Sequence, residues 1–220
     1  MTNNPTKRTY DDLNRAYDFF NERLFSGRLP RCLITMQRRP RSRGYFCGKR
    51  FETRDGKEVT DEIALNPQHF KGRTPREILS TLVHEMTHLE QEHFGKPSRS
   101  GYHNKEWAGL MKAVGLIPSS SGLEGGKETG QRVTHYIRQG GPFDRACAEL
   151  LKAGCTVAYV EAGPGHGEET RAKTARKKAA SKTKYTCPGC GLNAWAKPDV
   201  SIICSACDAE LVAEAAADAA

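Results

Sequence analysis

Hydrophobic residues near the start of the chain recur with the period of an α-helix. Between residues 9 and 25 they are spaced by four, three and four positions, on one helical face: Leu13, Tyr17, Phe20 and Leu24. Gly27 and Pro30 follow and interrupt the pattern. The sequence therefore predicts an amphipathic helix that packs against the rest of its domain and carries no chemistry of its own.

Residues 31–66 change to a pattern that is typical of strands. Three short runs, RCLITMQ, GYFCGKRF and DEIALN, are rich in β-forming residues and are separated by polar or glycine-bearing turns. We expect a small sheet here. Because these strands precede a long helical pattern, the fold class expected for the domain is α+β.

The next segment predicts a long helix with clear start and stop signals. Thr74 suits the N-cap, Pro75 the first helical position, and Glu77 completes a capping box. A broad apolar stripe follows at helical spacing: Ile78, Leu79, Leu82, Val83, Met86 and Leu89. Gly95 and Pro97 end the pattern.

This helix carries the motif HEMTH, residues 84–88. His84 and His88 lie about 40° apart around a helix and about 6 Å apart along it, so both imidazoles can share one zinc ion. Glu85 is turned by about 100° and is free to take a proton from a water on that ion. A chance match on a core-facing helix is the alternative, because short motifs misfire.

A catalytic zinc ion usually has three protein ligands, and three downstream residues compete for the third place. His93 lies about 140° around the same helix from His88, so we expect it to face away and contact solvent. Glu106 is a minor alternative. His103 is better placed, because it ends a polar, glycine-containing turn that can return it to the first helix before a second helix, NKEWAGLMKAVG, begins.

The middle of the chain is harder to assign. Residues 118–130, rich in Ser and Gly, are expected to form a flexible boundary. Residues 131–162 contain a strand-like VTHYI, a helix starting near Pro142 and a second strand-like run, TVAYVE. We expect this small α/β insert to pack on the preceding domain or to pair its own strands. We expect His135, within it, to serve packing or lie at the surface.

Basic residues cluster in two places, and the chain as a whole has a net charge of +8. One cluster is the run RRPRSRG, and the other is the linker of residues 163–184. Both are candidate phosphate contacts, although such runs are often merely solvated. The candidate nucleic-acid-binding residues are Arg38, Arg39, Arg41, Arg43, Arg176, Lys177 and Lys178.

Residues 185–212 contain two C-x-x-C pairs separated by thirteen residues: Cys187, Cys190, Cys204 and Cys207. Four thiolates at this spacing indicate a closed, structural zinc site in a small ribbon. Disulfide pairing is the alternative, but no signal peptide or membrane span is evident at this level. We therefore expect a protein that is not secreted and is located in the cytoplasm with the nucleoid, or in the nucleus of a eukaryote. Trp195 either stacks on a base or covers the ribbon.

The motifs together resemble those of the SprT-like zinc proteases. The resemblance rests on HEMTHL, on GYHNKEWAGLMKAVGL with its histidine fifteen positions after His88, and on FFNERLFSGRLP upstream. It covers residues 9–117 well and 185–212 in outline. It implies a zincin-like metalloprotease domain, with His84, His88 and His103 as zinc ligands and Glu85 as the catalytic residue.

The resemblance also implies a function, since family members are linked to DNA and degrade proteins near or crosslinked to it. We therefore expect one catalytic and one structural Zn²⁺, a protein substrate, and DNA as a partner in DNA–protein crosslink repair. Two alternatives remain. One is a DNA-binding or regulatory zinc module with little peptidase activity, and the other is a general cytosolic zinc peptidase.

Overall fold

The computed structural model describes residues 4–161 and 183–214, and the chain divides into two compact units, Met1–Glu161 and Ala162–Ala220. The described part of the first unit is α+β, and that of the second contains strands. Most of the predicted basic linker, including Arg176, Lys177 and Lys178, lies outside the described residues.

The first unit contains four α-helices among its described residues. They are α1 (Pro5–Phe25), α2 (Pro75–Phe94), α3 (Lys105–Ala113) and α4 (Pro142–Lys152). Its strands are β1 (Leu33–Met36), β2 (Gly44–Glu52), β3 (Val59–Leu65), β4 (Leu116–Ser119) and β5 (Thr134–Ile137). The helix expected over residues 9–25 and the three strands expected before α2 are confirmed.

The first three strands form one sheet in the order β1-β3-β2. β1 runs parallel to β3, whereas β2 runs antiparallel to it, with an irregularity between Cys47 and Phe51. β2 is thus an edge strand, and it is the strand of this sheet that packs most closely on α2.

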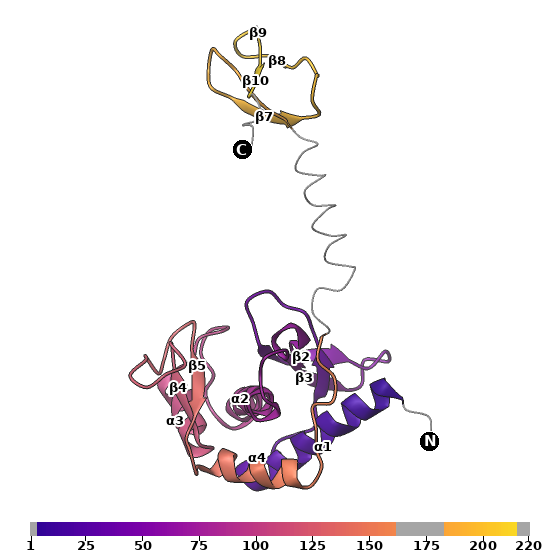
Figure 1. Ribbon diagram of the computed structural model, residues 1–220, viewed down its shortest axis with the longest axis vertical. Coiled ribbons are helices and arrows are strands. Elements are labelled where there is room, and N and C mark those ends of the chain that lie inside the picture. Colours follow the sequence, from indigo (N-terminus) through magenta and orange to yellow (C-terminus); the bar gives the residue numbers. More distant parts are fainter. Residues whose placement is uncertain (1–3, 162–182, 215–220) are drawn as a thin grey trace. The chain divides into compact units, whose positions relative to one another are not determined.

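Helix α2 lies at the centre of the first unit, with the sheet on one side and α3, β4 and β5 on the other (Figure 1). The capping box is present, because Thr74 and Glu77 each bond to the other's backbone amide. All of the helix's residues from Ile78 to Gln91 are buried except His88. A helix buried on this scale forms the core rather than lying on it.

Residues 116–161 complete this unit. β4 pairs with β5 in an antiparallel hairpin, and α4 packs against α1 with Phe143 5.5 Å from Phe20, ring centroid to ring centroid. Both the segment 118–130 and most of 131–162 therefore fall inside the first unit.

The prediction of a strand at TVAYVE is wrong. Residues 156–161 form no strand. The segment starts against α1, and at its other end Glu161 forms an ion pair with Arg38 in the loop between β1 and β2. Cys155 Sγ is 3.5 Å from the Asp12 carbonyl oxygen, and Thr156 Oγ1 is 3.3 Å from the Asp12 carboxylate.

The second unit is a small β-ribbon. One sheet has the order β10-β6-β7, from β6 (Thr183–Thr186), β7 (Asn193–Ala196) and β10 (Val212–Ala213). A second pairs β8 (Ile203–Cys204) with β9 (Ala209–Glu210). Its core contains Tyr185, Leu211 and two cysteines. Trp195 is 62% exposed, so it does not cover this core.

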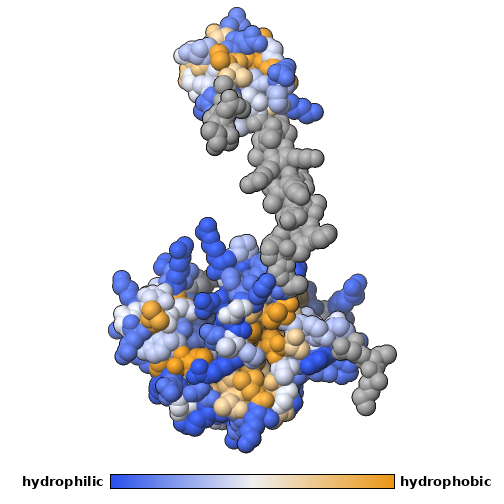
Figure 2. Space-filling view, viewed as in Figure 1, coloured by the Kyte–Doolittle hydropathy of each residue, from blue (hydrophilic) through white to orange (hydrophobic). Residues whose placement is uncertain are grey.

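Hydrophilic residues cover much of the visible surface of the first unit, interrupted by smaller hydrophobic areas (Figure 2). Within residues 4–161 and 183–214, none of the helices combines the length and apolar character that crossing a bilayer requires.

Candidate active site

Three histidines meet beside the central helix. His84 and His88 project from one face of α2, as their spacing requires, and His103 arrives from the loop before α3. One ring nitrogen from each residue lies within 4.8 Å of the other two. The ring centroids are 4.9–5.7 Å apart. The structure therefore brings together the set that the sequence favoured.

The loop that returns His103 is held where it meets α3. His103 and Gly130 exchange backbone hydrogen bonds of 2.9 and 3.0 Å, which makes an isolated antiparallel bridge. Asn104 then caps α3 by accepting from the amide of Trp107 at 2.9 Å. Because Gln91 of α2 donates to Asn104, the start of α3 is also tied to the end of α2.

The two competing residues lie elsewhere. His93 Nε2 is 2.7 Å from the carboxylate of Asp61, so it is outside the histidine cluster as expected, but it is paired with an acid rather than merely solvated. The Glu106 carboxylate accepts from the Gln91 side chain at 2.6 Å and from the Lys96 amide at 2.8 Å. Neither residue joins the group of potential ligands.

Trp107 packs against the rings of all three histidines. Its ring centroid is 4.3 Å from that of His103 and 4.9 Å from that of His84. The ring of His88 stacks on it at 5.0 Å and 20°. Since Trp107 is fully buried, it restricts the rotamers of all three imidazoles.

Burial keeps these imidazoles neutral. It lowers the pKa of His88 to about 3 and the pKa of His84 well below its usual value. The neighbouring histidines, His103 among them, lower both pKa values further. Burial also lowers the pKa of His103. A neutral imidazole offers the lone pair that a metal ion needs. Three such nitrogens, with no fourth side-chain ligand among the described residues, fit a zinc site that keeps a position open.

Glu85 is buried and faces the first residues of β2. A Cβ atom added at Gly44 would lie 3.2 Å from Glu85 Oε1, so the carboxylate lies against the strand's backbone. Burial raises the pKa of Glu85 to about 8, and the backbone amide of Phe46 opposes that rise. A carboxyl group with a pKa near neutrality is suited to both taking and giving a proton.

In two of the three histidines, Nδ1 forms a hydrogen bond with a group outside the cluster; we call it the outer nitrogen. His103 Nδ1 lies 3.1 Å from the carbonyl oxygen of Gly130. His84 Nδ1 lies 3.0 Å from Nδ1 of His135 in β5. Burial lowers the pKa of His135 to about 3, with smaller contributions from the charges of Arg73 and Arg43.

His135 was expected only to pack or to lie at the surface, because a lone histidine in a strand has no ligand spacing. The available signal was weak. The apolar run LIP, a Ser/Gly-rich turn and then VTHYI make the sequence pattern of a β-hairpin. The predicted helix that follows His103 leads directly into this hairpin.

The four ribbon cysteines form the second candidate metal site. Their sulfur atoms all lie within 4.8 Å of one another. Cys190 Sγ is 3.7 Å from Cys204 Sγ. Sulfurs sharing a tetrahedral zinc ion are about 3.8 Å apart, against about 2.05 Å in a disulfide, so the geometry fits the metal.

The protonation of these thiols agrees with a shared cation. The backbone amides of Cys190 and Gly189 lower the pKa of Cys187 to about 7, whereas the neighbouring thiols raise that of Cys207 to about 12. Cys187 and Cys207 cannot easily ionise together unless a positive charge lies between them.

The arginine-rich loop between β1 and β2 is exposed. Arg38 Nε lies 2.5 Å from the Glu161 carboxylate, and the guanidinium of Arg39 lies 5.0 Å from the ring centroid of Tyr45. Arg41 and Arg43 are exposed and form no ion pair within the described part of the chain.

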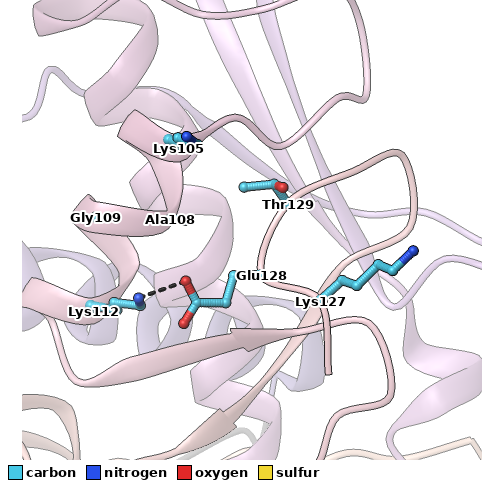
Figure 3. A pocket seen from close by; sticks show the side chains of 7 residues that line it. All are labelled: Lys105, Ala108, Gly109, Lys112, Lys127, Glu128 and Thr129. Atoms are coloured by element: carbon cyan, nitrogen blue, oxygen red, sulfur yellow. Dashed lines mark hydrogen bonds and ion pairs between the residues drawn. The ribbon is translucent and has the colours of Figure 1, made fainter. Parts of the chain in front are cut away.

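A pocket on α3 is lined by three lysines and one acidic residue, Glu128 (Figure 3). It lies between α3 and residues 127–129, and Lys112 forms an ion pair of 2.6 Å with Glu128 across it. Lys127 extends away from the helix. The pocket holds no histidine or cysteine.

Comparisons with known proteins agree with this geometry. A protein of Salmonella typhimurium, described as an uncharacterized protein in the mucB 3′ region, is 59% identical over 61 residues, which are 28% of this chain and 82% of that protein. The model of the SprT-like family matches residues 13–128, more than half of the chain. That match includes the three histidines and Glu85. The chain therefore belongs to the SprT-like family.

Proposed function

We propose that this protein is a zinc-dependent protease that hydrolyses peptide bonds in proteins bound or crosslinked to DNA. One observation carries the proposal. The three neutral imidazoles converge to within 4.8 Å, while the Glu85 carboxylate, one residue from His84, remains outside the ligand set. A purely structural zinc site needs four protein ligands and no adjacent buried acid.

The residues divide the chemistry among them. His84, His88 and His103 would hold Zn²⁺, and the ion when bound supplies Lewis-acid chemistry that acidifies water and polarises a carbonyl oxygen. Glu85 would take the proton from the attacking water and deliver it to the leaving amine. The second candidate site, formed by the ribbon cysteines, would hold a structural Zn²⁺.

The sheet supports an extended peptide as the substrate. β2 is an edge strand, and its first residues lie beside Glu85, because a Cβ atom at Gly44 would contact the carboxylate. An extended chain that pairs with β2 through its main chain would pass the catalytic acid. Main-chain pairing selects little for sequence, which suits a protease directed to its substrates by location.

DNA would supply that location. The net charge of +8 and the exposed arginines between β1 and β2 favour an anionic partner. Phosphate contacts of this kind weaken steeply with salt. DNA would then act as the platform on which substrate and enzyme meet, and would not itself be cut.

The test is cleavage of a DNA-bound protein by the wild-type chain beside Glu85→Gln, with and without single-stranded DNA, at low and high salt. Glu124→Gln, at an exposed position, is the matched control. We expect DNA-stimulated, salt-sensitive cleavage by the wild type and the control. Glu85→Gln should bind zinc and DNA but lose cleavage.

The other outcomes identify the alternatives. DNA binding without cleavage by the wild type under any condition would refute the protease and favour a DNA-binding zinc module. Cleavage that is indifferent to DNA and salt would refute the DNA-directed substrate class and favour a general peptidase.

A further inference from the structure

A chain of hydrogen bonds runs from His84 back into its own helix through a distant strand. His84 Nδ1 lies 3.0 Å from Nδ1 of His135, and His135 Nε2 lies 2.9 Å from the hydroxyl of Ser80. That hydroxyl in turn donates to the carbonyl oxygen of Glu77 at 2.8 Å. Ser80 and His84 lie one turn apart on α2, and His135 bridges them from β5.

The carbonyl oxygen of Glu77, the last group in this series of hydrogen bonds, sets the donor and acceptor of each of them. A carbonyl oxygen only accepts, so the single proton of Ser80 goes to Glu77. The hydroxyl oxygen then accepts from His135, which places that residue's proton on Nε2 and leaves its Nδ1 as an acceptor. His84 must therefore donate from Nδ1, and its lone pair stands on Nε2.

We propose that His135 is a positioning residue for the three-histidine site. It accepts a hydrogen bond from Nδ1–H of His84 and so holds that imidazole in the tautomer and ring orientation whose Nε2 can bind zinc. The inference rests on the proposed zinc site. A hydrogen bond to the outer nitrogen of a metal-binding histidine typically contributes about 10–100-fold to metal affinity.

The hairpin explains how His135 reaches the site. β4 and β5 pair in a register that sets His135 opposite Pro118. β4 is anchored because Leu116 and Pro118 are buried. Thr134 and Tyr136, the neighbours of His135 in β5, project to the opposite face of the strand.

The same segment also serves His103. The Nδ1 atom of His103 lies 3.1 Å from the Gly130 carbonyl oxygen, and this hydrogen bond fixes the tautomer of His103 in the same way. Residues 130–135 thus hold the outer nitrogens of two of the three histidines. These residues lie beyond the part of the chain that matches the family, which ends at residue 128.

A pair of substitutions separates hydrogen bonding from packing. Asn places its amide oxygen where histidine has Nδ1, whereas Leu has nearly the same shape as Asn and cannot accept a hydrogen bond. We expect His135→Leu to bind zinc at the histidine site about 10–100-fold more weakly, and His135→Asn to retain most of the affinity. His69→Leu, outside this network, is the control.

Zinc affinity is measured by chelator competition on the full-length chain, with the four-cysteine site as an internal reference. Thermal melts establish that each variant is folded. Equal weakening by Asn and Leu would assign His135 a packing role only and overturn the proposal, as would unchanged affinity in both.

A measurement on the wild type needs no substitution. Long-range ¹⁵N–¹H spectra of the zinc-loaded chain report the tautomer of each imidazole. We expect the proton on Nδ1 of His84 and on Nε2 of His135, and the reverse assignment of His135 would overturn the proposal. Neither readout requires proteolysis, so a zinc-binding chain that fails to cleave would refute the proposed function and leave this inference standing.

Discussion

Gly44 determines how closely β2 approaches α2, and replacing it with alanine tests that packing. A Cβ atom at this position would lie 2.8 Å from the Ala64 carbonyl oxygen and 2.9 Å from Thr81 Cγ2. It would also lie 3.2 Å from Glu85 Oε1. The backbone of Gly44 is not in the left-handed region, so the effect comes from contact alone.

The size of the effect follows from what can move. The carbonyl of Ala64 belongs to β3, which is paired on both sides, so the start of β2 must shift away instead. Overpacking of this kind typically costs about 1–3 kcal/mol. For a unit of this size, that lowers the melting temperature by roughly 2–12 °C. Because the shift occurs beside Glu85 and away from the histidines, proteolysis should fall more than zinc binding does.

Gly109→Ala is the matched control. Gly109 lies within α3, and a Cβ atom there would meet nothing within 4 Å. Alanine inside a helix is favoured over glycine by about 0.5–1 kcal/mol, so this variant should melt slightly above the wild type. Circular dichroism melts with saturating zinc, together with cleavage assays, measure both variants. Wild-type melting and cleavage in Gly44→Ala would refute the close approach of β2 to α2.

Three further predictions concern the capping box and the ribbon. Thr74→Ala should lower the free energy of unfolding by about 1 kcal/mol, measured by chemical denaturation, because the Thr74 side chain accepts from the Glu77 amide. Bonds from Thr74 lower the pKa of Glu77 below its unfolded value, so its contribution is present above about pH 4.5 and lost as the pH falls. A Glu77→Gln difference that persists in acid would contradict this. Removal of zinc should unfold residues 183–214, whose core is small, as limited proteolysis would show, whereas protection without metal would contradict it.

Local signals account for the parts of the site that the sequence predicted. The capping box, the apolar stripe and the terminal Gly95 define α2 without reference to the rest of the chain. Once α2 is a helix, the shared face of His84 and His88 follows from geometry. The rejection of His93 rests on the same angle, and the structure agrees that it lies outside the cluster.

Non-local pairing explains what the sequence did not predict. The order β1-β3-β2 decides which strand borders Glu85, and no local pattern encodes it. His135 meets His84 across 51 positions only because the β4–β5 register brings it there. The run at 156–161 has strand-forming residues but pairs with no described strand, and β-propensity alone does not supply a partner.

The physical boundary of the metal-binding unit therefore lies well beyond its motif. The family match ends at residue 128, yet Phe143, Cys147 and Leu150 belong to the same buried cluster as the residues of α2. The segment after residue 128 also supplies the acceptors for the outer nitrogens of His84 and His103. Metal ligands alone do not define a site that depends on tautomer and orientation. Residues 129–161 are thus part of the machinery that presents the histidines, and a separate appended domain would have no reason to share their core.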